Sequence, residues 1–189
     1  MGRYRPPEPE KTAVITAAGF ARLQQELNFL WKEKRPEVTA RVAAAAALGD
    51  RSENADYVYG KRQLTEIDRR IRYLDKRIRA MQVVDRLPSD TEKIYFGAWV
   101  TLEAVEDDRK LKRAGSTTTQ TYRLVGPDEI DSNNAYISID SPMAKALIGK
   151  SAADEISLVQ SAKSNHILSF EDTSQAHCYR ICHVSYEQP

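Results

Sequence analysis

The sequence predicts an α+β protein, in which an N-terminal antiparallel α-helical coiled-coil hairpin precedes a small, mainly antiparallel β domain with one short helix. Two observations predict the hairpin: two apolar seams of similar length have helical spacing, and only about six residues around Gly49 join them. The third observation is a change of composition after DRLPSD (85–90), where short strand-like runs replace the seams.

The first helix carries apolar residues three and four apart, with a slip of one residue before the last three: Phe20, Leu23, Leu27, Leu30, Val38, Val42 and Ala45. Pro36 lies inside that slip. Because proline lacks a backbone N–H and its ring crowds the preceding turn, we expect the helix to kink there.

The second helix has a more regular seam, with a heptad pattern over nearly three repeats: Leu64, Ile67, Ile71, Leu74, Ile78 and Met81. Each helix should have roughly 28–30 residues, which at ~1.5 Å per residue gives a rod of ~42–45 Å. A rod of this length carries its connecting loop away from its base.

Acidic residues recur every third position at the junction of the two helices, as Asp50, Glu53 and Asp56. One interpretation is structural, since Asp50 and Glu53 resemble a capping box that starts the second helix. The other is functional: two carboxylates three residues apart can converge on one point, although two alone bind Mg²⁺ poorly because the ion wants further oxygen ligands. The tip could therefore complete a site that another molecule supplies, and both interpretations can hold together.

The second helix is also strongly basic, with eight Lys/Arg against three Asp/Glu between residues 57 and 81. The basic residues are Lys61, Arg62, Arg69, Arg70, Arg72, Lys76, Arg77 and Arg79. A solvated coiled-coil face is the ordinary interpretation of such a run. The imbalance of charge favours instead an anion beside the rod, and a single nucleic-acid strand held through its phosphates would fit.

The second half of the chain should contain short strands and one helix. The runs that predict strands are 98–105, 121–126, 135–140, 154–159, 166–170 and 179–186. The helix lies in SPMAKALIGK, where Ser141 suits the N-cap, Pro142 the first turn and Gly149 the end. Residues 106–120 lack apolar periodicity and predict a mobile hairpin loop, while Trp31 and Trp99 should pack in the core or at the base of the rod.

The stretch AHCYRICH (176–183) brings two cysteines and two histidines together. On a regular strand, Cys178 and Cys182 would share one face while His177 and His183 share the other. This spacing argues against a zinc site and favours buried or half-buried structural thiols.

The composition points to a cytoplasmic protein. The 189 residues carry a net charge of +1, and their two cysteines do not make a disulfide framework. No apolar run approaches the ~18 residues of a membrane span, and MGRYRPPEPEK has no hydrophobic core of a signal peptide. We expect a disordered tail (1–12), the hairpin (13–86, with its acidic tip at 49–56) and a C-terminal domain (87–189).

Two long strings carry a family resemblance: KRPEVTARVAAAAALGDRSENADYVYGKRQLTEIDRRIRYLDKRI (34–78) and ISIDSPMAKALIGK (137–150). Both resemble the bacterial Gre transcript-cleavage factors, specifically the GreB type, and the likeness runs from about Ile15 to Ile156. The resemblance implies an FKBP-like C-terminal domain that docks at the mouth of the secondary channel of RNA polymerase. The coiled coil then enters the channel and delivers its tip to the active centre.

The resemblance also implies roles for residues. Asp50 and Glu53 match the two catalytic acids, which help to hold a second Mg²⁺ and the attacking water so that backtracked RNA is cleaved. The neighbours that would orient these acids or touch the RNA are Arg51, Ser52, Asn54 and Asp56. The eight basic residues match a patch that contacts the extruded 3′ end of the RNA. The polymerase-docking turn matches Asp140, Ser141, Pro142 and Met143.

On this basis we expect a monomeric cofactor rather than an enzyme, with no tightly bound group of its own and with Mg²⁺ shared in the polymerase complex; DNA binding belongs to the same expectation. The alternatives are a secondary-channel regulator that does not stimulate cleavage, a prolyl isomerase suggested by fold analogy alone, and a coiled-coil adaptor. The long 106–120 loop and the segment after Glu155 depart from the family pattern, which affects docking rather than the tip.

Overall fold

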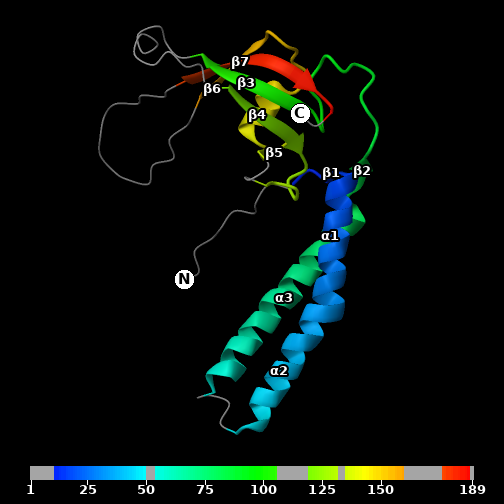
Figure 1. The fold of residues 1–189 in the computed structure, drawn as a ribbon, viewed down its shortest axis with the longest axis vertical. Coiled ribbons are helices and arrows are strands. Elements are labelled where there is room, and N and C mark those ends of the chain that lie inside the picture. The colour runs from blue at the N-terminus through cyan, green and yellow to red at the C-terminus, as the bar shows by residue number, and fades with distance from the viewer. Residues whose placement is uncertain (1–10, 50–53, 106–118, 132–134, 160–175, 188–189) are drawn as a thin grey trace, which may run out of the picture. The chain divides into compact units, whose positions relative to one another are not determined.

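The structure is a computed structural model that describes residues 11–49, 54–105, 119–131, 135–159 and 176–187. The chain falls into two compact units. One comprises residues 15–84 and is helical; the other comprises residues 1–14 together with 85–189 and contains the main sheet (Figure 1). The α+β class and the order of its parts are confirmed.

The helical unit is an antiparallel hairpin (Figure 1). Its elements are α1 (Ala17–Phe29), the π turn η1 (Leu30–Lys34), α2 (Arg35–Ala47) and α3 (Ala55–Ala80), with the short strands β1 (Val14–Thr16) and β2 (Gln82–Val84) pairing beside them. The first arm begins where Thr16 Oγ1 accepts a hydrogen bond from the backbone N–H of Gly19, at 3.0 Å. It continues through α1, η1 and α2 without a break, because both junction residues keep right-handed helical dihedral angles.

The slip in the first seam corresponds to the π turn. At its end, the N–H of Arg35 donates to the carbonyl of Leu30, five residues earlier. Such a turn holds one residue more than an α-helical turn, so Val38 returns to the side of Leu30 although it lies eight positions further along the chain. The irregularity expected at Pro36 therefore lies just before it, as a widened turn.

The predicted seams form the core of the hairpin. One cluster centres on Ile15, Leu23 and Leu74, and a second on Val38, Ile67 and Ile71. Towards the tip the two helices approach closely, because a Cβ built on Gly60 of α3 would lie 2.6 Å from Cγ2 of Val42.

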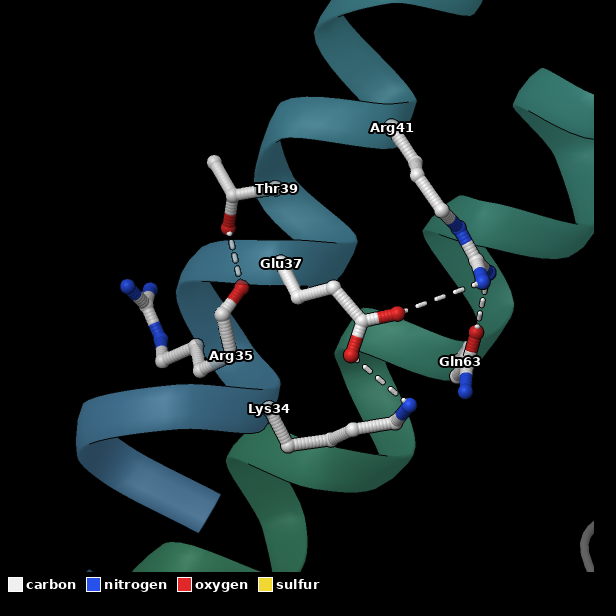
Figure 2. A network of polar contacts seen from close by, with 6 residues as sticks. All are labelled: Lys34, Arg35, Glu37, Thr39, Arg41 and Gln63. Carbon is white, nitrogen blue, oxygen red and sulfur yellow. Dashed lines mark hydrogen bonds and ion pairs between the residues drawn. The ribbon is translucent and has the colours of Figure 1, made fainter. Parts of the chain in front are cut away.

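Polar contacts accompany the π turn and join the two arms (Figure 2). Glu37 lies between Lys34, at 2.9 Å, and Arg41, at 3.7 Å. The hydrogen bond from Lys34, together with the positive charges of Lys34 and Arg41, lowers the pKa of the Glu37 carboxyl. Arg41 also donates to Oε1 of Gln63 on α3 at 2.8 Å, and Arg35 reaches Asp68 on α3 at the same distance.

The second unit is built on a five-stranded sheet in the order β5-β4-β3-β7-β6 (Figure 1). Its elements are β3 (Trp99–Val105), β4 (Thr119–Val125), β5 (Tyr136–Ser138), α4 (Pro142–Leu147), β6 (Glu155–Val159) and β7 (Ala176–Ser185). Among the described strands of this sheet, only β4 and β5 pair in parallel, so the mainly antiparallel prediction is confirmed. The core joins one face of the sheet to α4, with Val100, Leu102, Leu124, Leu147 and Ile181 at 1% exposure or less.

The predicted helix in this unit is also confirmed. Ser141 is the N-cap of α4 and accepts a hydrogen bond from the N–H of Ala144 at 3.1 Å, and Pro142 is the first helical residue. Gly149 follows with a φ of +81°, a conformation that side-chain-bearing residues rarely adopt. Of the other expectations, the strand at 166–170 and most of the 106–120 loop lie outside the described residues.

Three expectations about single residues need correction. The register of β7 on β3 shifts after the pair of Thr101 and His183, so a bulge at Cys182 interrupts the regular alternation of the cysteines and histidines. Cys182 is exposed rather than buried, and its Sγ lies 3.8 Å from the Glu103 carboxylate. Trp99 is buried as expected, but Trp31 is 56% exposed with the Arg35 guanidinium over its ring.

Candidate functional site

The tip of the hairpin is described up to its loop. Asp50, Arg51, Ser52 and Glu53 lie outside the described residues, whereas Asn54 is within them. The Oδ1 of Asn54 accepts from the backbone N–H of Tyr57 at 3.2 Å, and its Nδ2 donates to the carbonyl of Ala45 at 2.9 Å. One amide therefore starts α3 and ties it to the last turn of α2.

This geometry corrects the capping interpretation of the acids. The N-cap of α3 is Asn54, not Asp50, so Asp50 does not begin this helix. Asparagine is a favoured N-cap residue, and that signal was present in the sequence. Asp56 lies in the first turn of α3 and is exposed, and the side chains of Leu48 and Tyr59 beside the loop are 82% and 69% exposed.

The structure places all eight basic residues on α3 and divides them by their contacts. Ion pairs hold Arg62 with Glu66 at 3.3 Å, Arg70 with Glu26 at 2.7 Å, and Arg79 with Asp75 at 2.9 Å. Lys61 lies over the ring of Tyr57, and Arg77 is half-buried. These internal contacts support the interpretation of this part of the basic run as an ordinary coiled-coil face.

Arg69, Arg72 and Lys76 differ, and we call them the free cationic face. All three are exposed, and none has an acidic partner within 4 Å among the described residues. Their spacing of three and four places them on one side of α3, away from the buried Ile67 and Ile71. Such a face can contact successive phosphates of a strand without first breaking internal ion pairs.

The predicted docking turn is built from residues with internal contacts as well. The Asp140 carboxylate accepts hydrogen bonds from both the backbone N–H and the Oγ1 of Thr12, 128 positions earlier. Ser141 caps α4, and Met143 packs against the core cluster. Pro142 is the exposed member. Periodicity along the chain could not reveal the role of Thr12, because nothing local marks a contact across that separation.

This combination of a hairpin and a sheet unit corresponds to a known class of transcription proteins. Residues 13–83 match the family described as "Transcription elongation factor, N-terminal", and residues 89–172 match "Transcription elongation factor, GreA/GreB, C-term". The chain therefore belongs to the GreA/GreB family of transcription elongation factors.

Curated relatives extend the match over most of the chain. Transcription elongation factor GreB of Pseudomonas aeruginosa is 53% identical over 156 residues, which cover 82% of this chain and 87% of that protein. The GreB of Xanthomonas axonopodis pv. citri is 54% identical over 155 residues, with the same coverage. Among solved structures, GreA factor homolog 1 of Thermus thermophilus is 21% identical, covers 93% of this chain and 99% of its own, and superposes with a TM-score of 0.39.

The described residues also bear on metal sites and membrane spans. Within them, no three His, Cys, Asp or Glu side chains gather closely enough to hold a metal ion. No helix among the described residues is long and apolar enough to cross a membrane.

Proposed function

We propose that this chain stimulates the cleavage of backtracked RNA by RNA polymerase in the cytoplasm, acting as a monomer. The C-terminal unit docks at the mouth of the secondary channel through the turn at residues 140–143. The hairpin enters the channel, and the loop between its helices carries Asp50 and Glu53 to the active centre. The observation that supports this most directly is the free cationic face, which offers an unpaired surface for the extruded 3′ end of the RNA on the same arm as the acidic loop.

The chemistry of the donor set fits Mg²⁺ only as part of a shared site. Carboxylates are the hard oxygen ligands that this ion prefers, but two of them leave most of its coordination positions to other donors. When bound between the tip and the polymerase, the ion would activate water and neutralise charge on the reacting phosphate. Asp50 and Glu53 would add ligands that the hairpin carries to the polymerase, so the gain comes from proximity rather than from a catalytic centre in this chain.

The test uses a stalled, backtracked elongation complex with 3′-labelled RNA and Mg²⁺. Wild-type protein should release a short 3′ fragment, and Asp50→Ala or Glu53→Ala should lower the release rate at least ~100-fold, since each removes a preoriented metal ligand. Binding to the complex, measured by competition with labelled wild-type protein, should change less than about threefold, because the acids are not the docking surface.

Glu33→Ala is the matched control, because Glu33 is an exposed acid on the same hairpin without a described ion-pair partner. It should cleave like wild type. Full cleavage by both tip variants would refute the proposed mechanism, and polymerase binding without cleavage by the wild-type protein would assign it to the non-cleaving channel regulators.

A further inference from the structure

Three side chains form a row across neighbouring strands of the main sheet. Trp99 on β3 pairs directly with Arg123 on β4, and Arg123 pairs directly with Tyr136 on β5. Residues opposite one another in adjacent strands project from the same face of a sheet. This face is the one away from α4, since the alternate residues Val100 and Leu124 lie in the core.

The two rings hold the guanidinium in place. The Cζ of Arg123 lies 5.4 Å from the centre of the Trp99 ring and 5.5 Å from that of the Tyr136 ring. The rings meet edge to face, with centres 5.8 Å apart. Trp99 is 8% exposed and Arg123 is half-buried, so the charged group has already lost much of its hydration and its freedom of rotation.

Arg123 nevertheless has no anion among the described residues. Its Nη1 donates a hydrogen bond to the Tyr136 hydroxyl at 3.3 Å, and its buried Nε has no acceptor there. No carboxylate in the described part of the chain lies within 4 Å of it, whereas the partly buried Arg35 of the hairpin pairs with Asp68. A half-buried cation without a counter-charge is costly, and aromatic rings compensate for only part of that cost.

We propose that the row of Trp99, Arg123 and Tyr136 binds a carboxylate side chain on the surface of a protein partner. A planar, preoriented guanidinium is suited to a carboxylate, and Trp, Tyr and Arg are the residues most enriched among interface hot spots. A nucleic-acid strand is less suited to it, because a strand needs several cations at the spacing of phosphates, as on the free cationic face, and the row offers one.

The inference rests on the proposed function for the identity of the partner, which is RNA polymerase. The row lies in the unit that carries the docking turn, and Tyr136 is two residues before Ser138, whose hydroxyl accepts from the N–H of Asp140. The carboxylate site and the turn can therefore belong to one docking surface. Arg123 acts there in affinity, not in the cleavage step.

The experiment measures the binding of the full chain to a polymerase elongation complex, by competition with labelled wild-type protein, alongside the cleavage rate. Arg123→Lys keeps the charge and the packing of the stem but removes the planar pair of donors. We expect its dissociation constant to rise about tenfold, as for an interface hot spot. Its maximal cleavage rate at saturation should equal that of wild type.

Arg180→Gln is the matched control, because Arg180 is an exposed arginine of the same sheet that is already paired with Glu155. Its dissociation constant should stay within about twofold of wild type, since it offers no free donor pair. Arg123→Gln should weaken binding at least as much as Arg123→Lys, and thermal melting of each variant separates this effect from a loss of folded protein.

The possible outcomes test the carboxylate site separately from the proposed cleavage function. Unchanged polymerase binding by Arg123→Lys, with wild-type protein binding normally, would overturn the carboxylate site and leave the cleavage function intact. Weaker binding of single-stranded RNA with unchanged polymerase binding would also overturn it. Absence of polymerase binding by wild-type protein would instead refute the proposed function.

Discussion

Asn54 shows how much a single side chain organises at the end of the hairpin. Its oxygen starts α3 by accepting from the Tyr57 N–H, and its nitrogen ties α3 to the Ala45 carbonyl of α2. The first role follows from sequence, because asparagine is a favoured N-cap. The second could not be predicted, since it depends on how the two helix ends are placed in space.

Replacing Asn54 separates these two roles. Asn54→Asp keeps an N-cap acceptor but loses the donor to Ala45, so it should lower the melting temperature by about 2–4 °C, for a loss of ~1 kcal/mol. Asn54→Ala loses the cap as well and should lower it further, by another ~0.5–2 kcal/mol of stability. Thermal melting of both variants checks this order.

The rate of transcript cleavage should depend on the hydrogen bond from Asn54 to the Ala45 carbonyl rather than on the N-cap hydrogen bond from the Tyr57 N–H. We therefore expect Asn54→Asp and Asn54→Ala to reduce the rate of transcript cleavage to a similar degree, because both leave the loop less well anchored. A full cleavage rate in Asn54→Asp would show that the tie to α2 does not position the acids.

Among the elements, the π turn marks the limit of what residue spacing can predict. The spacing from Leu30 to Val38 revealed a slip of one residue, and Pro36 marked its position. Spacing cannot tell a bend from a widened turn, because that depends on whether Arg35 bonds back four residues or five. The remaining seam residues were predicted correctly because burial on one side of a helix repeats in sequence.

Deleting one residue tests the relation between the turn and Pro36. Removal of Glu33 restores a heptad spacing between Leu30 and Val38, but it leaves Pro36 inside a regular α-helix, at a cost of ~3 kcal/mol. We expect a lower melting temperature for the deletion alone. Adding Pro36→Ala to the deletion should recover most of the loss.

Deletion of Thr39 is the control, since Thr39 is exposed and lies in α2 beyond the π turn. This deletion rotates Val42 and Ala45 away from the seam, and Pro36→Ala should not rescue it. Equal rescue of both deletions would show that the widened turn has no particular relation to the proline.

At the scale of the whole molecule, the net charge does not reveal how the charged residues are distributed. The net charge is only +1, yet α3 carries an exposed cationic face that the rest of the chain does not neutralise by contact among the described residues. The sequence predicted the basic helix but not which of its residues form ion pairs, because Arg70 contacts Glu26 only when the two arms pack. The sequence also could not predict the contact of Thr12 with Asp140 or the row around Arg123, because both form only when distant segments pack.

Reversing charge on this face should weaken the response to backtracked RNA. For Arg69→Glu with Lys76→Glu, we expect a higher concentration for half-maximal cleavage, with the largest difference from wild type at low salt. The slope of log affinity against log salt should fall by about 1–2, because each phosphate of a single strand that is no longer neutralised lowers it by ~0.7.

Arg22→Glu with Lys32→Glu is the matched control, because it makes the same change of net charge at exposed residues of the other arm. This variant should leave the concentration for half-maximal cleavage and the slope of log affinity against log salt close to wild type. Equal effects of the two pairs would show that only total charge matters and that α3 is ordinary solvated surface.

The close approach of Gly60 to Val42 has a consequence for passage through a narrow opening. A methyl group added at residue 60 would lie 2.6 Å from Cγ2 of Val42, so either the Val42 side chain or the spacing of the arms must shift to accept it. Alanine also favours the helix, by up to ~1 kcal/mol over glycine, which offsets part of the strain. Under the proposed function, a hairpin widened by Gly60→Ala would lose some stability in solution and would also enter the secondary channel less readily.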